Sequence, residues 1–254
     1  MTLALSVYLR ANVPNKVVAC FAETGQYAKI IVYAKRVGYT PDYASLLQHV
    51  TRLNPEHGAE FASQLVNDEM GPLVDVERVV DVFMSQNMIQ QATSFLLDAL
   101  KDNKPEQGHL QTRLLEMNLV NAPQVADAIL GNQMFSHYDK ARIAQLCEKA
   151  GLPQRALEHY EDINDIKRVV VHTNLLQPDW LVEYFGTLTV EQTLECFNEM
   201  LKVNIRQNLQ VVVQAATKYS DLIGPVRLIE MFEKFKTAEG ESRQSLPSHV
   251  TREC

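Results

Sequence analysis

Apolar and polar residues follow one another along this chain with the period of an α-helix, from Leu3 to Phe235. Apolar side chains recur three or four positions apart, which places them on one face of a helix. About sixteen such stretches are separated by short breaks. The strict alternation of a half-buried β-strand is absent from the sequence over any useful length. The pattern therefore predicts an all-α chain of short amphipathic helices.

Residues 141–160 show how two of these helices join. Gly151 follows the last apolar position of the first helix, where a left-handed cap favours a residue without a Cβ atom. Pro153 suits the first turn of a returning helix, because its missing N–H would be unpaired there in any case. The stripes that face each other are Ile143, Ala144, Leu146 and Cys147 on the first helix, and Ala156, Leu157 and Tyr160 on the second. This segment is predicted to be a helical hairpin.

The same hairpin pattern recurs along the chain. Gly151 aligns with Gly25, Asn87 and Asn204, and glycine and asparagine are the residues that best tolerate a left-handed cap. The aligned residues four positions earlier are all apolar: Phe21, Phe83, Cys147 and Met200. Spacings of 62, 64 and 53 residues (87−25, 151−87 and 204−151) fit two hairpins of about 30 residues per period. Because a lone hairpin cannot bury its apolar stripe, neighbours must stack, and we predict a right-handed α-solenoid of antiparallel helical hairpins.

Several helix starts are predicted from capping residues. Asn54 and Thr40 each precede a proline, a combination that indicates a helix N-terminus. Residues 189–192 (TVEQ) and 121–124 (NAPQ) have the spacing of a capping box, in which two side chains bond to each other's backbone amides.

The composition of the chain disfavours several classes of function. The chain has 254 residues and a formal net charge of −7. A surface for nucleic acid or anionic lipid needs clustered Lys and Arg, so neither is expected as the main partner. No apolar run is long enough for a transmembrane span or a signal peptide. The scattered cysteines Cys20, Cys147, Cys196 and Cys254 favour reduced thiols in an intracellular protein.

One acidic segment offers a candidate metal site. Glu161, Asp162 and Asp165 resemble the aspartate-rich sequence with which helical prenyl-transfer enzymes hold magnesium against a diphosphate. No second acidic cluster completes such a site in the sequence. Asn164 or Asp165 is better interpreted as the N-cap of the following helix, where negative charge is favourable. We therefore expect no metal and no cofactor.

Three further groups of residues are candidates for a functional role. Cys147 and His159 could form a nucleophile and its base, but aromatic residues occupy the same repeat positions elsewhere, which favours a role in packing. The seven histidines lack the spacing of a zinc site. The aromatic residues Trp180, Tyr184 and Phe185 lie at helical spacing and are expected to pack between hairpins, with capture of a peptide as the alternative. No catalytic residue is predicted.

Extended stretches of the sequence closely resemble the clathrin heavy-chain family. They include residues 110–119 (LQTRLLEMNL), 122–139 (APQVADAILGNQMFSHYD), 145–151 (QLCEKAG) and 204–210 (NIRQNLQ). Residues 8–16 (YLRANVPNK) and 37–42 (VGYTPD) match as well, and the similarity runs from about Leu3 to Gly240.

The resemblance implies a segment of the distal leg, near the ankle, of a three-legged coat protein. On the family's template of five-hairpin repeats, residues 1–38 end one repeat, 39–187 form a complete one and 188–238 begin another. The implied function is structural: legs run side by side and build a lattice on vesicles during endocytosis and intracellular protein transport. The implied partners are other heavy-chain legs, with clathrin light chain and adaptors engaged only through the full-length protein. The implied location is the cytoplasmic face of coated pits and vesicles, peripheral to the membrane.

The chain departs from the family at its end. After Gly240 family members continue as helices, whereas residues 239–254 become polar and are expected to form a disordered tail. The apolar helix pattern at the first residues suggests a piece of something longer. Two other classes of function stay open at this point: a solenoid adaptor or tethering module that binds peptide motifs in membrane trafficking, and a helical enzyme that uses Glu161, Asp162 and Asp165.

Overall fold

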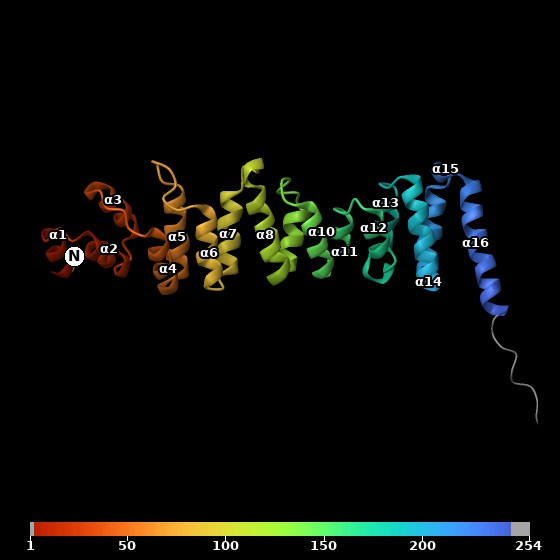
Figure 1. The fold of residues 1–254 in the computed structure, drawn as a ribbon, viewed down its shortest axis with the longest axis horizontal. Coiled ribbons are helices and arrows are strands. Elements are labelled where there is room, and N and C mark those ends of the chain that lie inside the picture. The colour runs from red at the N-terminus through yellow and green to blue at the C-terminus, as the bar shows by residue number, and fades with distance from the viewer. Residues whose placement is uncertain (1–2, 245–254) are drawn as a thin grey trace, which may run out of the picture. The chain divides into compact units, whose positions relative to one another are not determined.

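The structure, a computed structural model, describes the backbone of residues 3–244 and the side chains of residues 3–235. Within this range it contains sixteen α-helices, two short 3-10 helices and no strand, so the predicted all-α fold is confirmed (Figure 1). The chain divides into two compact units, Met1–Asp139 and Lys140–Cys254.

Each unit is a series of short helices. The first holds α1 (Leu3–Arg10), α2 (Pro14–Glu23), α3 (Tyr27–Val37), α4 (Tyr43–Leu53), α5 (Pro55–Val66), α6 (Val76–Ser85), α7 (Ile89–Ala99), η1 (Pro105–Gln107), α8 (Gly108–Asn121) and α9 (Pro123–Gly131). The second holds α10 (Lys140–Lys149), α11 (Pro153–Leu157), α12 (Ile163–Val170), η2 (Thr173–Leu175), α13 (Pro178–Phe185), α14 (Val190–Lys218), α15 (Ser220–Ile223) and α16 (Pro225–Gln244).

The helices pack as stacked hairpins within each unit. In the first, α2 packs on α3, α4 on α5, α6 on α7 and α8 on α9. Each hairpin also contacts the next, as α4 does α6 and α5 does α7. In the second, α10 packs on α11, and α12 and α13 both pack on α14. Contacts made only between sequential neighbours are those of a solenoid, so the predicted helical solenoid is confirmed.

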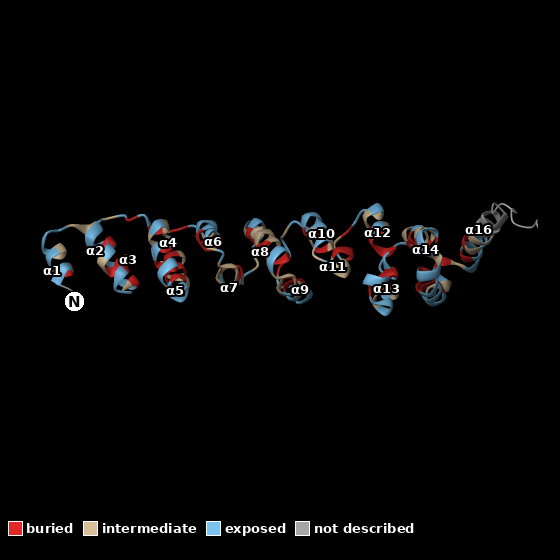
Figure 2. Ribbon diagram, turned by 90° about the horizontal axis from the view of Figure 1, so that it is seen from below, coloured by how far each residue is buried: buried red, intermediate tan, exposed pale blue. Residues whose placement is uncertain are grey.

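The buried faces of the helices form the core, shown in red in Figure 2. Its largest fully buried side chains include Phe61 and Phe83 in the first unit and Phe185 and Phe197 in the second. Two buried polar pairs join neighbouring elements, Thr93 with Asn118 and Thr173 with Asn208. The apolar stripes seen in the sequence are therefore the surfaces on which hairpins stack.

Three hairpins have the same type of turn between their two helices. Gly25, Asn87 and Gly151 have φ angles of 70°, 58° and 78°, the left-handed conformation expected at these positions. The amide that follows each of them donates a hydrogen bond back to the preceding helix. The bonds run from Gln26 to Phe21 (2.9 Å), from Met88 to Phe83 (2.9 Å) and from Leu152 to Cys147 (2.8 Å), all to backbone carbonyls. The accepting carbonyls belong to the aligned apolar residues, which is the pattern of a Schellman cap.

Asn204 does not form such a cap, and the prediction made for it is wrong. Its φ and ψ are −155° and 86°, an extended conformation at a kink inside α14. Its side-chain Oδ1 accepts a hydrogen bond from the amide of Gln207 (3.2 Å). Asparagine is favoured at the N-cap of a helix as well as in the left-handed conformation. Here it caps the second half of a kinked helix. The interval before Asn204 is 53 residues (204−151), shorter than the 62 and 64 residues between the other aligned positions (87−25 and 151−87).

The predicted helix starts are confirmed in two cases and wrong in two. Asn54 caps α5 through its side chain, and Thr189 and Gln192 form the predicted capping box of α14. Helix α4 is capped by Asp42 rather than by Thr40, because it begins at Tyr43, two residues later than predicted. The box expected at 121–124 is absent, since Asn121 still belongs to α8 and donates its side-chain amide to the carbonyl of Met117.

The repeat boundaries at 38/39, 187/188 and 238/239 stay predictions. Helix α16 continues to Gln244, so the start expected for the polar tail at 239 lies inside this helix. Residues 245–254 of that expected tail lie outside the described residues.

Candidate functional site

The acidic segment before α12 is used for capping and ion pairing. The Oδ1 atom of Asp162 accepts a hydrogen bond from the amide of Asn164 (2.8 Å) and so caps the helix. The cap expected at Asn164 or Asp165 is therefore misplaced, because the helix begins earlier, at Ile163. Asp165 pairs with Arg168 at 2.6 Å, and Glu161 is exposed. In the part of the chain that the structure describes, no group of three or more acidic, His or Cys side chains is placed to hold a metal ion.

Arg168 joins α12 to α10 through a charged cluster that the sequence did not reveal. Its guanidinium donates from Nε to Glu148 Oε1 (3.2 Å) and from a terminal nitrogen to Glu148 Oε2 (2.8 Å). The Tyr160 hydroxyl donates to the same Oε2 at 2.6 Å, and the guanidinium lies 5.7 Å from the centre of the Tyr160 ring. These groups border a cleft of about 480 Å³. Every charge named here is paired, which favours a structural role in holding α10 and α12 together.

The cluster shifts the acidity of its members. Hydrogen bonds from Arg168, then from Tyr160, lower the pKa of Glu148, because they stabilise its carboxylate form. Burial, followed by the bond to Glu148, raises the pKa of the Tyr160 hydroxyl. The pairing thus keeps Glu148 charged and Tyr160 neutral near neutral pH.

We expect Glu148→Gln to lower the free energy of unfolding at pH 7 by about 1 kcal/mol, a modest value because the pair is partly exposed. A carboxylate with a depressed pKa stabilises the fold above its unfolded pKa, and this contribution is lost as pH falls through the folded value. The difference between wild type and variant should therefore shrink below about pH 4. Urea unfolding at pH 7 and pH 3.5 measures this difference in the free energy of unfolding, with Glu161→Gln as the exposed control. A difference of equal size at both pH values would contradict this assignment.

Cys147 and His159 both lie in the second unit. Cys147 is fully buried in α10, as expected for a packing residue. The imidazole Nδ1 of His159 lies 2.6 Å from the backbone carbonyl oxygen of Arg155. At Cys196, another buried thiol, burial raises the pKa to about 12 and keeps the sulfur protonated.

The aromatic residues of α13 pack within the second unit. The Trp180 and Tyr184 rings stack at 5.3 Å, and Phe185 meets Phe197 edge to face at 4.9 Å. The buried Tyr184 hydroxyl donates to the carbonyl of Leu157 (3.2 Å), which ties α13 to the end of α11. These contacts support the predicted role in packing.

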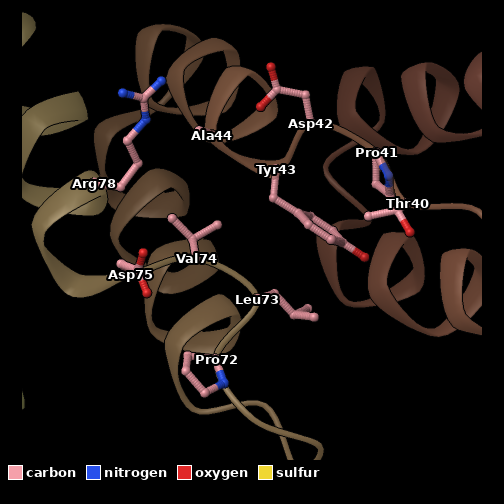
Figure 3. A pocket seen from close by; sticks show the side chains of 10 residues that line it. All are labelled: Thr40, Pro41, Asp42, Tyr43, Ala44, Pro72, Leu73, Val74, Asp75 and Arg78. Atoms are coloured by element: carbon pink, nitrogen blue, oxygen red, sulfur yellow. The ribbon is translucent and has the colours of Figure 1, made fainter.

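A second cleft, absent from the sequence predictions, lies in the first unit (Figure 3). It has a volume of about 450 Å³ and is bordered by the start of α4, the start of α6 and the loop before α6. Its lining residues are Thr40, Pro41, Asp42, Tyr43, Ala44, Pro72, Leu73, Val74, Asp75 and Arg78. Tyr43 and Val74 are buried, whereas Asp42, Asp75 and Arg78 are exposed. The cleft therefore combines an apolar floor with a charged rim.

No helix in the described part of the chain has the length and apolar character needed to cross a membrane.

Comparison with known proteins identifies the fold's relatives. A family model described as a region in clathrin and VPS proteins matches residues 67–209, more than half of the chain. The chain is 65% identical to a clathrin heavy chain of Drosophila melanogaster over 240 residues, 94% of its own length. It is 63% identical to human clathrin heavy chain 2 and 61% identical to a probable clathrin heavy chain of Schizosaccharomyces pombe, over 94% and 93% of its length.

The chain spans about 14% of the length of each of these relatives. The matched region includes α6 to α13, with the turns at Asn87 and Gly151. The sequence match and the stacked hairpins agree, and the chain belongs to the clathrin family.

Proposed function

We propose that the chain is a structural segment of a clathrin heavy-chain leg, which supports a coat lattice on vesicles through contacts with neighbouring legs. The observation that carries this proposal is the 65% identity to a clathrin heavy chain across 94% of the chain. Light chains and adaptors would be engaged through other parts of the full-length protein. The coat would lie on the cytoplasmic face of coated pits and vesicles, peripheral to the membrane.

The internal contacts suit a mechanical role. Between α6 and α8, Arg113 forms an ion pair with Asp81 at 2.5 Å, and one helical turn away His109 Nε2 lies 3.5 Å from a carboxylate oxygen of Glu77. In the second unit, Lys167 of α12 pairs with Glu195 of α14 at 3.0 Å. Each exposed pair contributes little alone, but together with buried apolar faces they hold successive hairpins in register. Such a stack transmits load from one hairpin to the next.

A chimera tests the proposal. In full-length Drosophila heavy chain, the aligned segment is replaced by residues 3–240 of this chain, and coat formation is followed by sedimentation and electron microscopy. Coats of normal yield are expected, since a leg segment should be interchangeable between relatives. An equally long segment of an unrelated helical solenoid serves as the control and should give none. A folded, three-legged chimera that forms no coats would overturn the proposal.

A further inference from the structure

Helices α3 and α5 lie side by side in one layer of the first unit, and α2 and α4 lie in the other layer (Figure 2). Two contacts show that α3 and α5 run in the same direction and in register. At their N-terminal ends the Tyr27 hydroxyl lies 3.5 Å from His57 Nδ1. At their C-terminal ends Lys35 pairs at 2.6 Å with Asp68, just beyond α5. The outward sides of the two helices therefore form one continuous surface, which we call the α3–α5 face.

The α3 half of this face is basic. Lys29, Val32 and Arg36 stand at positions i, i+3 and i+7, on the side of α3 that is turned away from its buried residues. Val32 is 68% exposed, a high value for an apolar side chain in the middle of a helix. Lys29 donates to the side-chain oxygen of Gln26, and no counter-charge is found for Lys29 or Arg36 among the residues that the structure describes. The α3 half thus presents two cations around an exposed valine.

The α5 half of the face is acidic. Glu56 and Glu60 are exposed and stand one helical turn apart, on the side of α5 opposite its buried residues. Within residues 3–235, no hydrogen bond or ion pair is found for either carboxylate. Two anions without a counter-charge therefore lie on the helix next to the two cations of α3.

The α3–α5 face is complementary to itself under a two-fold rotation. A two-fold axis in the contact plane, parallel to the two helices and midway between them, places α3 of each copy on α5 of the other. The two stacks of hairpins then run in opposite directions. An axis along the stack would instead place α3 on α3 and α5 on α5, where like charges meet. Charge therefore favours the antiparallel arrangement.

The distribution of charge along the first unit favours the same arrangement. Residues 1–38 carry five basic side chains and one acidic one, a net charge of +4. Residues 39–139 carry five basic and fourteen acidic side chains, a net charge of −9. An axis between α3 and α5 brings the basic part of each copy onto the start of the acidic part of the other, so the wider field is attractive as well.

We propose that two copies of this chain bind each other through their α3–α5 faces, with α3 of each copy on α5 of the other. Lys29 and Arg36 pair with Glu56 and Glu60 of the second copy, and Val32 packs against the aliphatic parts of these glutamates. The contact is weak for an isolated pair and sensitive to salt, because its charges are exposed. As a contact between neighbouring legs of a coat, it rests on the proposed function.

Charge reversal with rescue tests the contact. Sedimentation equilibrium of the full 254-residue chain at low salt should show self-association that weakens as salt is added. Lys29→Glu/Arg36→Glu and, separately, Glu56→Lys/Glu60→Lys should each weaken it by at least about tenfold, because like charges then meet.

Two mixtures of charge should restore the association. An equimolar mixture of the two double variants pairs opposite charges at both of its contacts. A single chain with all four changes does the same and keeps the wild-type net charge of −7, so its recovery cannot come from a change in overall repulsion. Both should associate like wild type.

Lys16→Glu/Arg206→Glu is the matched control, because it makes the same charge change at exposed sites on α2 and α14, outside the α3–α5 face. It should associate like wild type, and circular dichroism checks that every variant is folded. A monomeric wild type, double variants that associate normally, or a fourfold variant that stays monomeric would each overturn the contact.

The same reversals in the heavy-chain chimera separate the two proposals. Coat yield that falls in both double variants and recovers in the fourfold variant supports the α3–α5 contact between legs. Normal coats from the double variants would reject this surface and leave the proposed function intact, whereas an unaltered chimera that forms no coats would overturn the proposed function itself.

Discussion

Gly58→Ala should lower the free energy of unfolding by about 2 kcal/mol, although alanine is the better helix former by about 1 kcal/mol. Gly58 is buried in α5 at its contact with α4. A Cβ atom at this position would lie 2.7 Å from the Cα and 2.4 Å from the Oγ1 of Thr51. Because a backbone atom is in the way, no rotamer change relieves the overlap, and the two helices must separate.

Urea unfolding followed by circular dichroism measures this loss. Gly186→Ala is the matched control, because there the added methyl group meets the ring end of Tyr219, a side chain with freedom to move. We expect the control to lose less than about 1 kcal/mol, since a flexible side chain yields more easily than backbone. Equal losses for the two variants would show that the contact between α4 and α5 is looser than described.

Asn208→Ala should cost about 3 kcal/mol or more, because it leaves several buried polar groups without partners. Asn208 is completely buried in the second half of α14. Its Oδ1 accepts from the Thr173 hydroxyl (2.7 Å), and its Nδ2 donates to the carbonyls of Val171 (3.1 Å) and Met200 (2.8 Å). One side chain therefore joins η2 to both sides of the kink at Asn204.

The same unfolding experiment tests Asn208, and hydrogen exchange of the amides around η2 shows where protection is lost. Asn198→Ala is the control, since the one hydrogen bond found for its side chain goes to Leu194 of the same helix (2.8 Å). That variant should stay within about 0.5 kcal/mol of wild type. A loss at Asn208 no larger than at Asn198 would mean that the kink is held by apolar packing alone.

Local patterns were enough to predict the helices and most of their turns. The left-handed positions at Gly25, Asn87 and Gly151 follow from residue type and from the apolar residue four positions earlier. Asn204 has the same residue type and spacing but starts a helix segment instead. Asparagine suits both roles, so only the hydrogen bond to Gln207 decides between them.

The clusters that join helices were not predictable in the same way. Glu148 and Arg168 lie twenty residues apart in the sequence, and the partners of Asn208 lie up to 37 residues away. No periodic pattern marks such pairs, because they depend on how one hairpin stacks on another. The cleft at the starts of α4 and α6 likewise depends on the path of the loop before α6, which residue preferences alone do not determine.

Electron cryomicroscopy of coats built from the heavy-chain chimera tests most directly whether this chain is a structural leg segment. If the account is right, the density of residues 3–235 forms part of the lattice edges as stacked hairpins, in contact with a neighbouring leg. Coats in which this segment projects away from the edges and touches no neighbouring leg would contradict it.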